Sequence, residues 1–101
     1  MTKISFQGEH GAYSESAARK YFKEQPYRLE GEIETSPCNT FGDALENTEN
    51  DKTEFSILPV ENSIEGTVGQ SIDVITNTKL NAVGEVYLKI KHCLIGSGKL
   101  E

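Results

Sequence analysis

Residues 55–66 read FSILPVENSIEG, a short apolar run that ends in a carboxylate, an amide and a hydroxyl. A buried strand has this form, a brief apolar run bounded by turn signals, and Pro59 is tolerated at a strand end where no ladder hydrogen bond is needed. In open α/β sheets, ligands bind outside the carboxyl ends of the strands. Glu61, Asn62 and Ser63 are therefore the first candidates for a functional site.

Strand and helix patterns alternate on both sides of this stretch. The expected elements are strands at 3–7, 32–35 and 55–60, helices at 14–25, 40–47 and 67–77, and a last apolar segment at 81–95 that is either one long strand or two short ones. Ser14, Thr40 and Thr67 are expected to be N-caps, because a hydroxyl accepts a hydrogen bond from the backbone at a helix start.

This order of elements predicts one α/β domain. Strands that alternate with helices form a mainly parallel sheet with right-handed crossovers. A chain of 101 residues has room for one hydrophobic core. The third helix is expected to bury Val68, Ile72 and Ile75, which recur at helical spacing.

Composition excludes several classes of function. The formal charge of −6 repels phosphate backbones and anionic membrane surfaces, so neither a nucleic acid nor a membrane is expected as a partner. Cys38 and Cys93 are isolated and no Cys/His spacing suits a metal, so we expect reduced thiols, no metal site and a cytoplasmic location. His92 is expected to be a structural histidine at a strand end rather than a base.

Two strand-to-helix turns, at 8–14 and 60–67, carry the unusual chemistry of the chain. Each presents the backbone N–H groups of a helix start, which bind anions such as carboxylates. A nucleotide ligand is disfavoured, because Gly8-x-x-Gly11 lacks the dinucleotide spacing and no phosphate-loop lysine follows it.

Each candidate residue also has a purely structural interpretation. Ser14 and Thr67 can be caps alone, and Asn62 and Ser63 can hold a turn through hydrogen bonds to the backbone. Glu61 favours a functional role, because a carboxylate directly after a buried strand is expected to be desolvated, which suits acid–base work.

Three parts of the chain resemble the signature motifs of prephenate dehydratases. They are residues 6–18 (FQGEHGAYSESAA), residues 58–66 (LPVENSIEG) and the pair GEV at 84–86 with IKHCL at 90–94. Their order and spacing are similar to the family's along the whole chain. The arogenate dehydratases share all three motifs.

The resemblance implies a fold and a place within it. The family's catalytic region has two lobes that resemble those of type II periplasmic binding proteins, each a three-layer α/β sandwich with a mainly parallel sheet, and the substrate lies in the cleft between them. Residues 1–101 would be the first lobe. The Thr-Arg-Phe motif, whose threonine is held to be the main acid, belongs to the second lobe, and a phenylalanine-binding ACT domain follows it. Because this sequence contains neither, the chain alone is expected to be inactive.

The resemblance also implies roles for individual residues. Glu61 and Asn62 would be the catalytic residues of this lobe, which orient the substrate or hydrogen-bond its leaving group. Substrate contacts would come from Ala12, Tyr13, Ser14, Ser63 and Gly66. The reaction converts prephenate to phenylpyruvate with loss of water and carbon dioxide; aromatisation drives it, so no cofactor is needed.

Two alternatives to a prephenate dehydratase fragment stay open. One is a fragment of an arogenate dehydratase, whose small-molecule substrate differs in its amino-acid side chain. The other is a non-catalytic lobe that binds a small carboxylate with the same helix ends. We also expect a homo-oligomer, because a lone lobe exposes a sheet edge, and exposed edges invite pairing.

Overall fold

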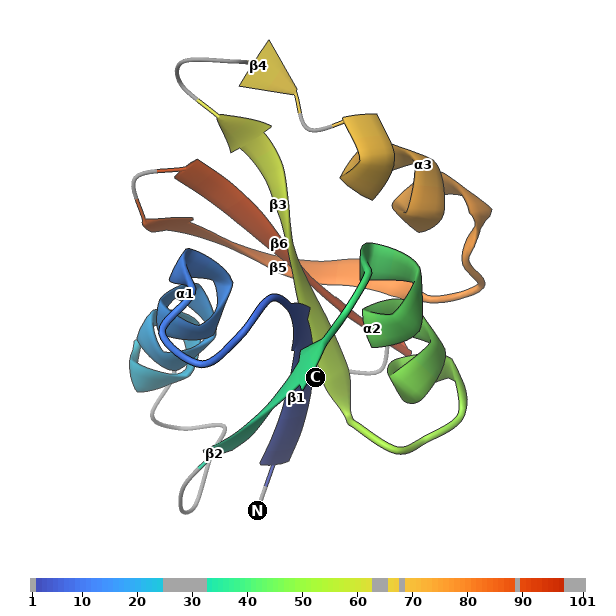
Figure 1. The fold of residues 1–101 in the computed structure, drawn as a ribbon, viewed down its shortest axis with the longest axis horizontal. Coiled ribbons are helices and arrows are strands. Elements are labelled where there is room, and N and C mark those ends of the chain that lie inside the picture. Colours follow the sequence, from blue (N-terminus) through green and yellow to red (C-terminus); the bar gives the residue numbers. More distant parts are fainter. Residues whose placement is uncertain (1, 25–32, 63–65, 68, 89, 98–101) are drawn as a thin grey trace.

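The computed structural model describes residues 2–24, 33–62, 66–67, 69–88 and 90–97. The elements are β1 (Thr2–Gln7), α1 (Tyr13–Lys23), β2 (Ile33–Cys38), α2 (Phe41–Glu49), β3 (Phe55–Asn62), β4 (Gly66–Thr67), α3 (Gly69–Asn77), β5 (Asn81–Leu88) and β6 (Ile90–Gly96) (Figure 1). The last apolar segment is thus two strands, one of the two alternatives that the sequence left open.

The five longer strands form one sheet in the order β2-β1-β3-β6-β5, and the short β4 pairs with β3. β1 lies parallel to both β2 and β3, whereas β6 lies antiparallel to β3 and to β5. β5 therefore runs in the same direction as the first three strands, which confirms a mainly parallel sheet. The antiparallel β6 follows β5 after a single residue, too short a connection for a parallel crossover.

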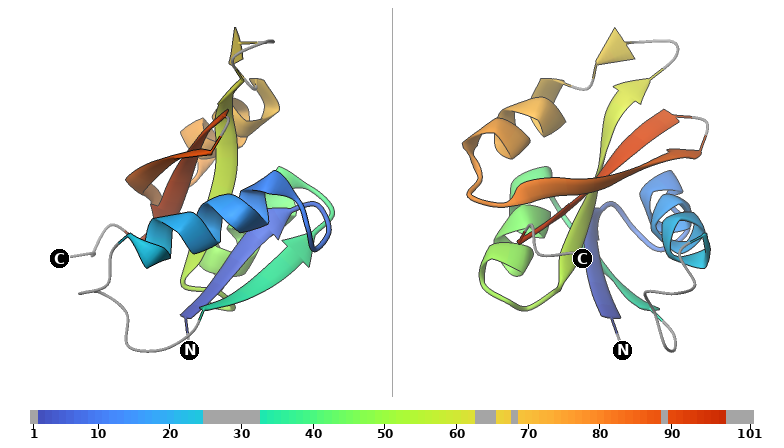
Figure 2. Two further views of the ribbon diagram at one scale, coloured as in Figure 1. Left: turned by 90° about the vertical axis from the view of Figure 1, so that its left-hand side faces the viewer. Right: turned by 180° about the vertical axis from the view of Figure 1, so that it is seen from behind.

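The helices cover both faces of the sheet, which confirms the three-layer arrangement. α1 lies on one side, and α2 and α3 lie on the other (Figures 1 and 2). The α1 face of the core contains Ile4, Phe6, Ala17, Ala18, Tyr21, Phe22, Ile57, Val86 and Leu94. The opposite face is built around Leu45, Leu58 and Ile95, which pack with apolar side chains of α2 and α3. Successive strand residues point to opposite faces, so Ile57 and Leu58 belong to different layers.

The three predicted helix caps have different outcomes. Thr40 is the N-cap of α2, and its Oγ1 accepts a hydrogen bond of 3.0 Å from the N–H of Asp43. The prediction for Ser14 is wrong: the N-cap of α1 is Ala12, two residues earlier, and Ser14 is a buried residue of the first turn. Thr67 lies in β4, because the chain forms a further strand before α3 begins.

The predicted buried stripe of α3 is also displaced. Ile72 is exposed, whereas Ser71 is fully buried and Val74 and Ile75 pack against the core. Val68 lies outside the described residues. The face of the helix that turns to the core thus carries positions 71, 74 and 75, so Ile75 is the member of the predicted stripe that the structure confirms.

A network of hydroxyl groups is buried between the sheet and α2. The Oγ atoms of Ser5 and Ser56 each lie 2.7 Å from the carbonyl oxygen of Ala44, and 2.9 Å from one another. Thr48 Oγ1 lies 2.8 Å from Thr53 Oγ1 and 2.5 Å from Ser56 Oγ. All four hydroxyl-bearing residues are buried, so they satisfy one another where water is excluded.

Candidate functional site at the carboxyl edge of the sheet

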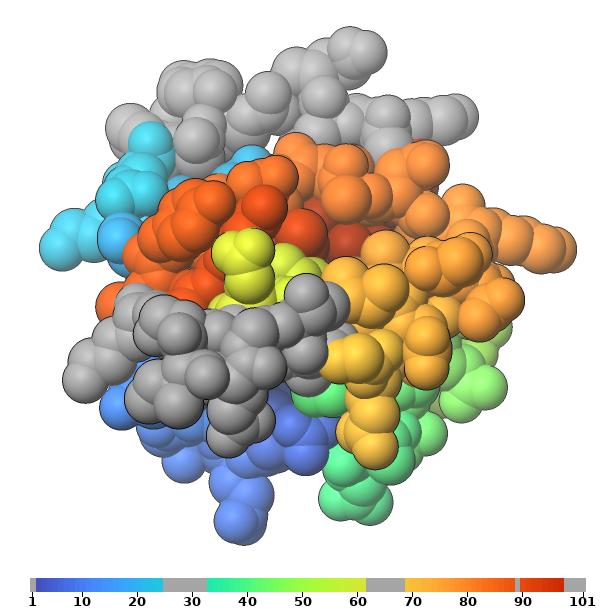
Figure 3. All heavy atoms as spheres, turned by 90° about the horizontal axis from the view of Figure 1, so that it is seen from above, coloured from blue at the N-terminus to red at the C-terminus, as the bar shows by residue number. Residues whose placement is uncertain are grey.

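The two turns that the sequence singled out lie at the same edge of the sheet. β1 and β3 are parallel neighbours, so the segments that follow them leave the sheet in the same direction. β3 extends further than β1: Phe6 is paired with Ile57, and Glu61 stands four residues beyond that pair. The tip of β3 therefore projects from the edge, where it lies between the β5–β6 ribbon and α3 (Figures 1 and 3).

Glu61 is exposed at this tip, contrary to the expected desolvation. Its backbone pairs with Thr67 of β4 on one side and with Lys91 of β6 on the other. The register shifts between Pro59 and Glu61, and the intervening Val60 stays buried. Among the described side chains of β3, that of Val60 is thus the last buried one. Because β3 extends beyond the end of β1, the carboxylate of Glu61 lies in solvent.

Asn62 is the last residue of β3, and its backbone pairs with Gly66 at the start of β4. The β3–β4 ladder brings the two ends of the 62–66 segment together. Ser63 lies outside the described residues, and the structure does not describe the Asn62 side chain. The choice between a turn-holding and a substrate-binding role for these two residues therefore stays a prediction.

Lys91 is a basic residue at this edge that sequence reasoning missed. Its ammonium lies 3.4 Å from the Glu85 carboxylate, and its side chain is about a quarter exposed. Hydrogen bonding and attraction to Glu85 raise the pKa of Lys91, and Tyr87 and Glu61 add smaller contributions in the same direction. The strand register brings these side chains together around Lys91, because it pairs Lys91 with Glu61 of β3 and with Tyr87 of β5. Only the pairing of β6 with β3 and with β5 could have revealed it.

The first turn is a tight connection between β1 and α1. Gly8 and Gly11 have φ values of +128° and +99°, a region that side chains with a Cβ rarely adopt. The Gly8 N–H donates to the carbonyl of Cys38 at 2.9 Å, and the Ala12 N–H donates to the carbonyl of Glu9 at 3.0 Å. The two glycines thus let the chain reverse within a few residues and enter α1.

The carboxylate of Glu15 holds this turn through contacts with His10 and Gly11. Its Oε1 accepts a 2.7 Å hydrogen bond from the Gly11 N–H, and its Oε2 accepts one of 2.6 Å from the Thr35 hydroxyl and lies 2.8 Å from His10 Nδ1. These hydrogen bonds lower the pKa of Glu15 to about 2, and the bond from Thr35 has the largest effect. Burial acts in the opposite direction.

The three residues at the start of α1 present different groups to a ligand. Tyr13 is exposed, Ala12 is half-buried and Ser14 is buried. A ligand above this turn would meet the side chain of Tyr13, whereas Ser14 is buried as a whole residue.

His92 lies in the interior of β6, between Pro59 of β3 and Val86 of β5. It is fully buried, its Nδ1 lies 3.3 Å from the carbonyl of Ile90, and its Nε2 has no partner among the described residues. Burial lowers the pKa of this imidazole, so it is held in the neutral form.

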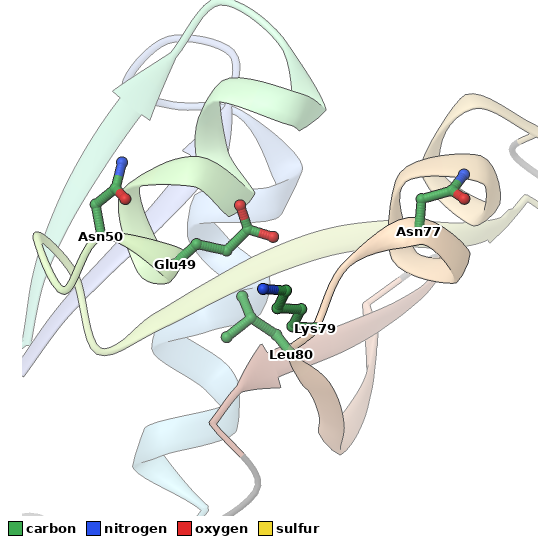
Figure 4. A pocket seen from close by; sticks show the side chains of 5 residues that line it. All are labelled: Glu49, Asn50, Asn77, Lys79 and Leu80. Carbon is green, nitrogen blue, oxygen red and sulfur yellow. The ribbon is translucent and has the colours of Figure 1, made fainter.

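Two surface cavities lie away from Glu61. One of about 380 Å³ is lined by Glu49, Asn50, Asn77, Lys79 and Leu80, at the ends of α2 and α3 that are remote from the β3 tip (Figure 4). A shallower one of about 370 Å³ lies between the first turns of α2 and α3. Within the part of the chain that the structure describes, no three His, Cys, Asp or Glu side chains gather as a metal site. None of the helices in that part is long and apolar enough to cross a membrane.

The fold and the edge together define a class: an α/β lobe with a mainly parallel sheet, whose polar residues gather where β1 and β3 end. Residues 4–101 match the prephenate dehydratase family. The chain belongs to this family.

Known proteins of the family show the same relationship. The chain is 34% identical over 101 residues to the bifunctional chorismate mutase/prephenate dehydratase of Buchnera aphidicola, covering 100% of this chain and 25% of that protein. It is 39% identical over 94 residues to arogenate dehydratase/prephenate dehydratase 1 of Arabidopsis thaliana, covering 93% of this chain and 22% of that protein. The structure of prephenate dehydratase from Streptococcus mutans superposes with a TM-score of 0.78 at 25% identity, covering 95% of this chain and 50% of that chain. The chain thus spans about a quarter of the length of these curated relatives.

Proposed function

We propose that residues 1–101 form the first lobe of a prephenate dehydratase, which converts prephenate to phenylpyruvate together with a second lobe. The family match over residues 4–101 carries this proposal. The coverage of about half of the Streptococcus mutans chain supports the assignment to one lobe. A cytoplasmic location and a homo-oligomer stay predictions.

The proposed chemistry fits the carboxyl edge. The departing ring hydroxyl must be protonated while two substrate carboxylates are held in place. Glu61 stands at the exposed tip of β3, where a second lobe laid over the edge would bury it next to the substrate. We assign Glu61 and Asn62 to orienting the substrate or hydrogen-bonding its leaving group. Ala12, Tyr13, Ser14, Ser63 and Gly66 would supply the remaining contacts of this lobe.

A chimera tests the proposal directly. Residues 1–101 replace the matching half of the Streptococcus mutans enzyme, and phenylpyruvate formation from prephenate is measured. The chimera is expected to turn over prephenate, whereas the 101-residue chain alone forms no product. Glu61→Gln is expected to lower kcat by about 100-fold, in the range of lost acid–base or leaving-group assistance. Glu34→Gln, which changes an exposed carboxylate on β2, is the matched control and should leave kcat unchanged.

The outcomes separate the hypotheses. A folded chimera without turnover would contradict the dehydratase proposal and favour a non-catalytic carboxylate-binding lobe. Robust turnover by the 101-residue chain alone would contradict the assignment of the essential acid to a second lobe.

Arogenate is the second candidate substrate, because the Arabidopsis relative is named for both activities. The two substrates differ only in the side chain remote from the ring hydroxyl. Competition between prephenate and arogenate for the chimera decides between them: the preferred substrate is the one with the higher kcat/KM.

A further inference from the structure

One buried carboxylate, that of Glu15, joins three separate segments of the lobe. Glu15 belongs to α1. Its carboxylate accepts hydrogen bonds from the Gly11 N–H of the turn and from the Thr35 hydroxyl of β2, and it contacts His10 of the turn. Its side chain is 12% exposed, and Arg19, one helical turn further on, places Nη2 3.6 Å from it. The carboxylate therefore connects the turn and α1 to β2 of the sheet.

The geometry differs from an ordinary helix start. Glu15 occupies the third position of α1, from which a glutamate side chain usually reaches back to the backbone N–H of the N-cap. Here the N-cap is Ala12, which has no side-chain oxygen, and Glu15 reaches one residue further, to Gly11. The hydrogen bond therefore holds the turn that precedes the helix.

The two ends of the turn have contacts of their own, and Ala12 also packs against the core. The first end is fixed by the bond from the Gly8 N–H to Cys38, and the last residue by the bond from the Ala12 N–H to Glu9 within the turn itself. His10 is largely exposed, and the centroid of its ring lies 6.2 Å from that of Phe6. Glu15 ties the middle of the turn to the body of the lobe.

We propose that Glu15 is a positioning residue of the active site, which fixes the place of Ala12 and Tyr13 by holding Gly11 and His10 against Thr35. This inference rests on the proposed dehydratase function, in which the α1 turn contacts the substrate. Glu15 acts through the turn and does not itself meet the substrate, because its oxygens are engaged by the turn and by Thr35.

Kinetics of the chimera test the role. Glu15→Gln keeps the size of the side chain but replaces one acceptor oxygen with a donor, so it cannot accept from both Gly11 and Thr35. We expect KM for prephenate to rise about tenfold, with a smaller change in kcat. Thr35→Val is expected to raise KM less, and Thr35→Ser, which keeps the hydroxyl, to restore the wild-type KM.

Ser56→Ala is the matched control for stability. Ser56 belongs to the buried hydroxyl network on the opposite face of the sheet, so its loss destabilises the lobe without touching the turn. Its KM is expected to stay within about twofold of wild type, as for a change remote from the ligand. Equal KM values for Glu15→Gln and Ser56→Ala, with both variants folded, would overturn the proposal.

A second measurement separates this proposal from the proposed function. In the full 101-residue chain, the amide resonance of Gly11 is expected to shift strongly upfield in Glu15→Gln, because a short bond to a carboxylate is lost, while resonances of β5 and β6 stay in place. A wild-type chimera without turnover would refute the dehydratase function alone. An unchanged Gly11 resonance would refute the positioning by Glu15 whatever the chimera does.

Discussion

The acid stability of the lobe is expected to depend on Glu15 more than on any other described carboxylate. Its pKa is about 2 in the folded chain and 4.5 for the unperturbed group. The carboxylate is therefore ionised in the folded chain at pH values where the unfolded chain already binds a proton. Its contribution to stability is complete above pH 4.5 and is lost as the pH falls from there toward 2.

The size of the effect follows from the same shift. At about 1.4 kcal/mol per pKa unit, the full displacement corresponds to about 3 kcal/mol of unfolding free energy. The side chain is 12% exposed, so solvent screens part of the interaction and we expect about 2 kcal/mol in practice.

Urea unfolding of wild type and Glu15→Gln, followed by circular dichroism between pH 6 and pH 2.5, measures this difference. We expect Glu15→Gln to be less stable by about 2 kcal/mol at pH 6, and the gap to close toward pH 2.5. Glu34→Gln is the control, because Glu34 is an exposed carboxylate on the same strand as Thr35. A gap of constant size across this range would refute the reasoning, since it would mean that the charge on Glu15 contributes nothing.

Three further predictions concern other parts of the lobe. Thr40→Ala removes the N-cap of α2 and is expected to lower the unfolding free energy by about 1 kcal/mol in the same urea assay. Gly84→Ala is expected to cost about 1 to 3 kcal/mol, because a Cβ at that position would lie 2.5 Å from the buried Tyr21 Oη, whereas Gly69→Ala meets no atom within 4 Å and should be tolerated. Burial lowers the pKa of His92, so the unfolded chain binds a proton first, and stability should fall as the pH drops below 6.5; His92→Gln should lose this dependence in urea melts between pH 7.5 and pH 5.5.

Local patterns in the sequence were sufficient for most elements. Alternation in 3–7 and helical spacing in 14–25 predicted β1 and α1, and the cap at Thr40 was found because its partner, the Asp43 N–H, lies three residues away. The direction of β6 could not be read in this way, because the pattern at 81–95 suits a strand of either direction. Strand pairing, a tertiary property, decided it.

The sequence predicted where Glu61 lies in the fold, but not the environment of its side chain. Glu61 does lie at the end of a buried strand. Its exposure, however, depends on how far β3 extends beyond β1, which no local sequence pattern predicts. The Glu15 contacts were missed for a similar reason, since Thr35 is 20 residues away in the sequence. Contacts of this range follow from the packing of α1 on β2.

The buried hydroxyl network shows a further limit of sequence patterns. Ser5 and Ser56 occupy strand positions that a hydrophobic pattern assigns to solvent, yet both are fully buried against α2. Burial is tolerated because Thr48 and Thr53 bring hydroxyl groups to the same place, and a hydroxyl is able both to donate and to accept a hydrogen bond. A polar residue in a strand therefore predicts exposure only where no partner faces it.

Charge at the carboxyl edge limits what this lobe could do for the doubly negative substrate proposed above. Lys91 is already engaged by Glu85, and Arg19 and His10 lie against Glu15, so these positive or ionisable groups near the edge each have a carboxylate beside them. The chain as a whole carries a formal charge of −6, which opposes the approach of a dianion. The N–H of Gly11, in the turn just before α1, is likewise occupied by Glu15. The two carboxylates of prephenate would therefore draw most of their positive charge from the second lobe proposed above, and the first lobe would contribute mainly shape and the groups at the tip of β3 and on the α1 turn.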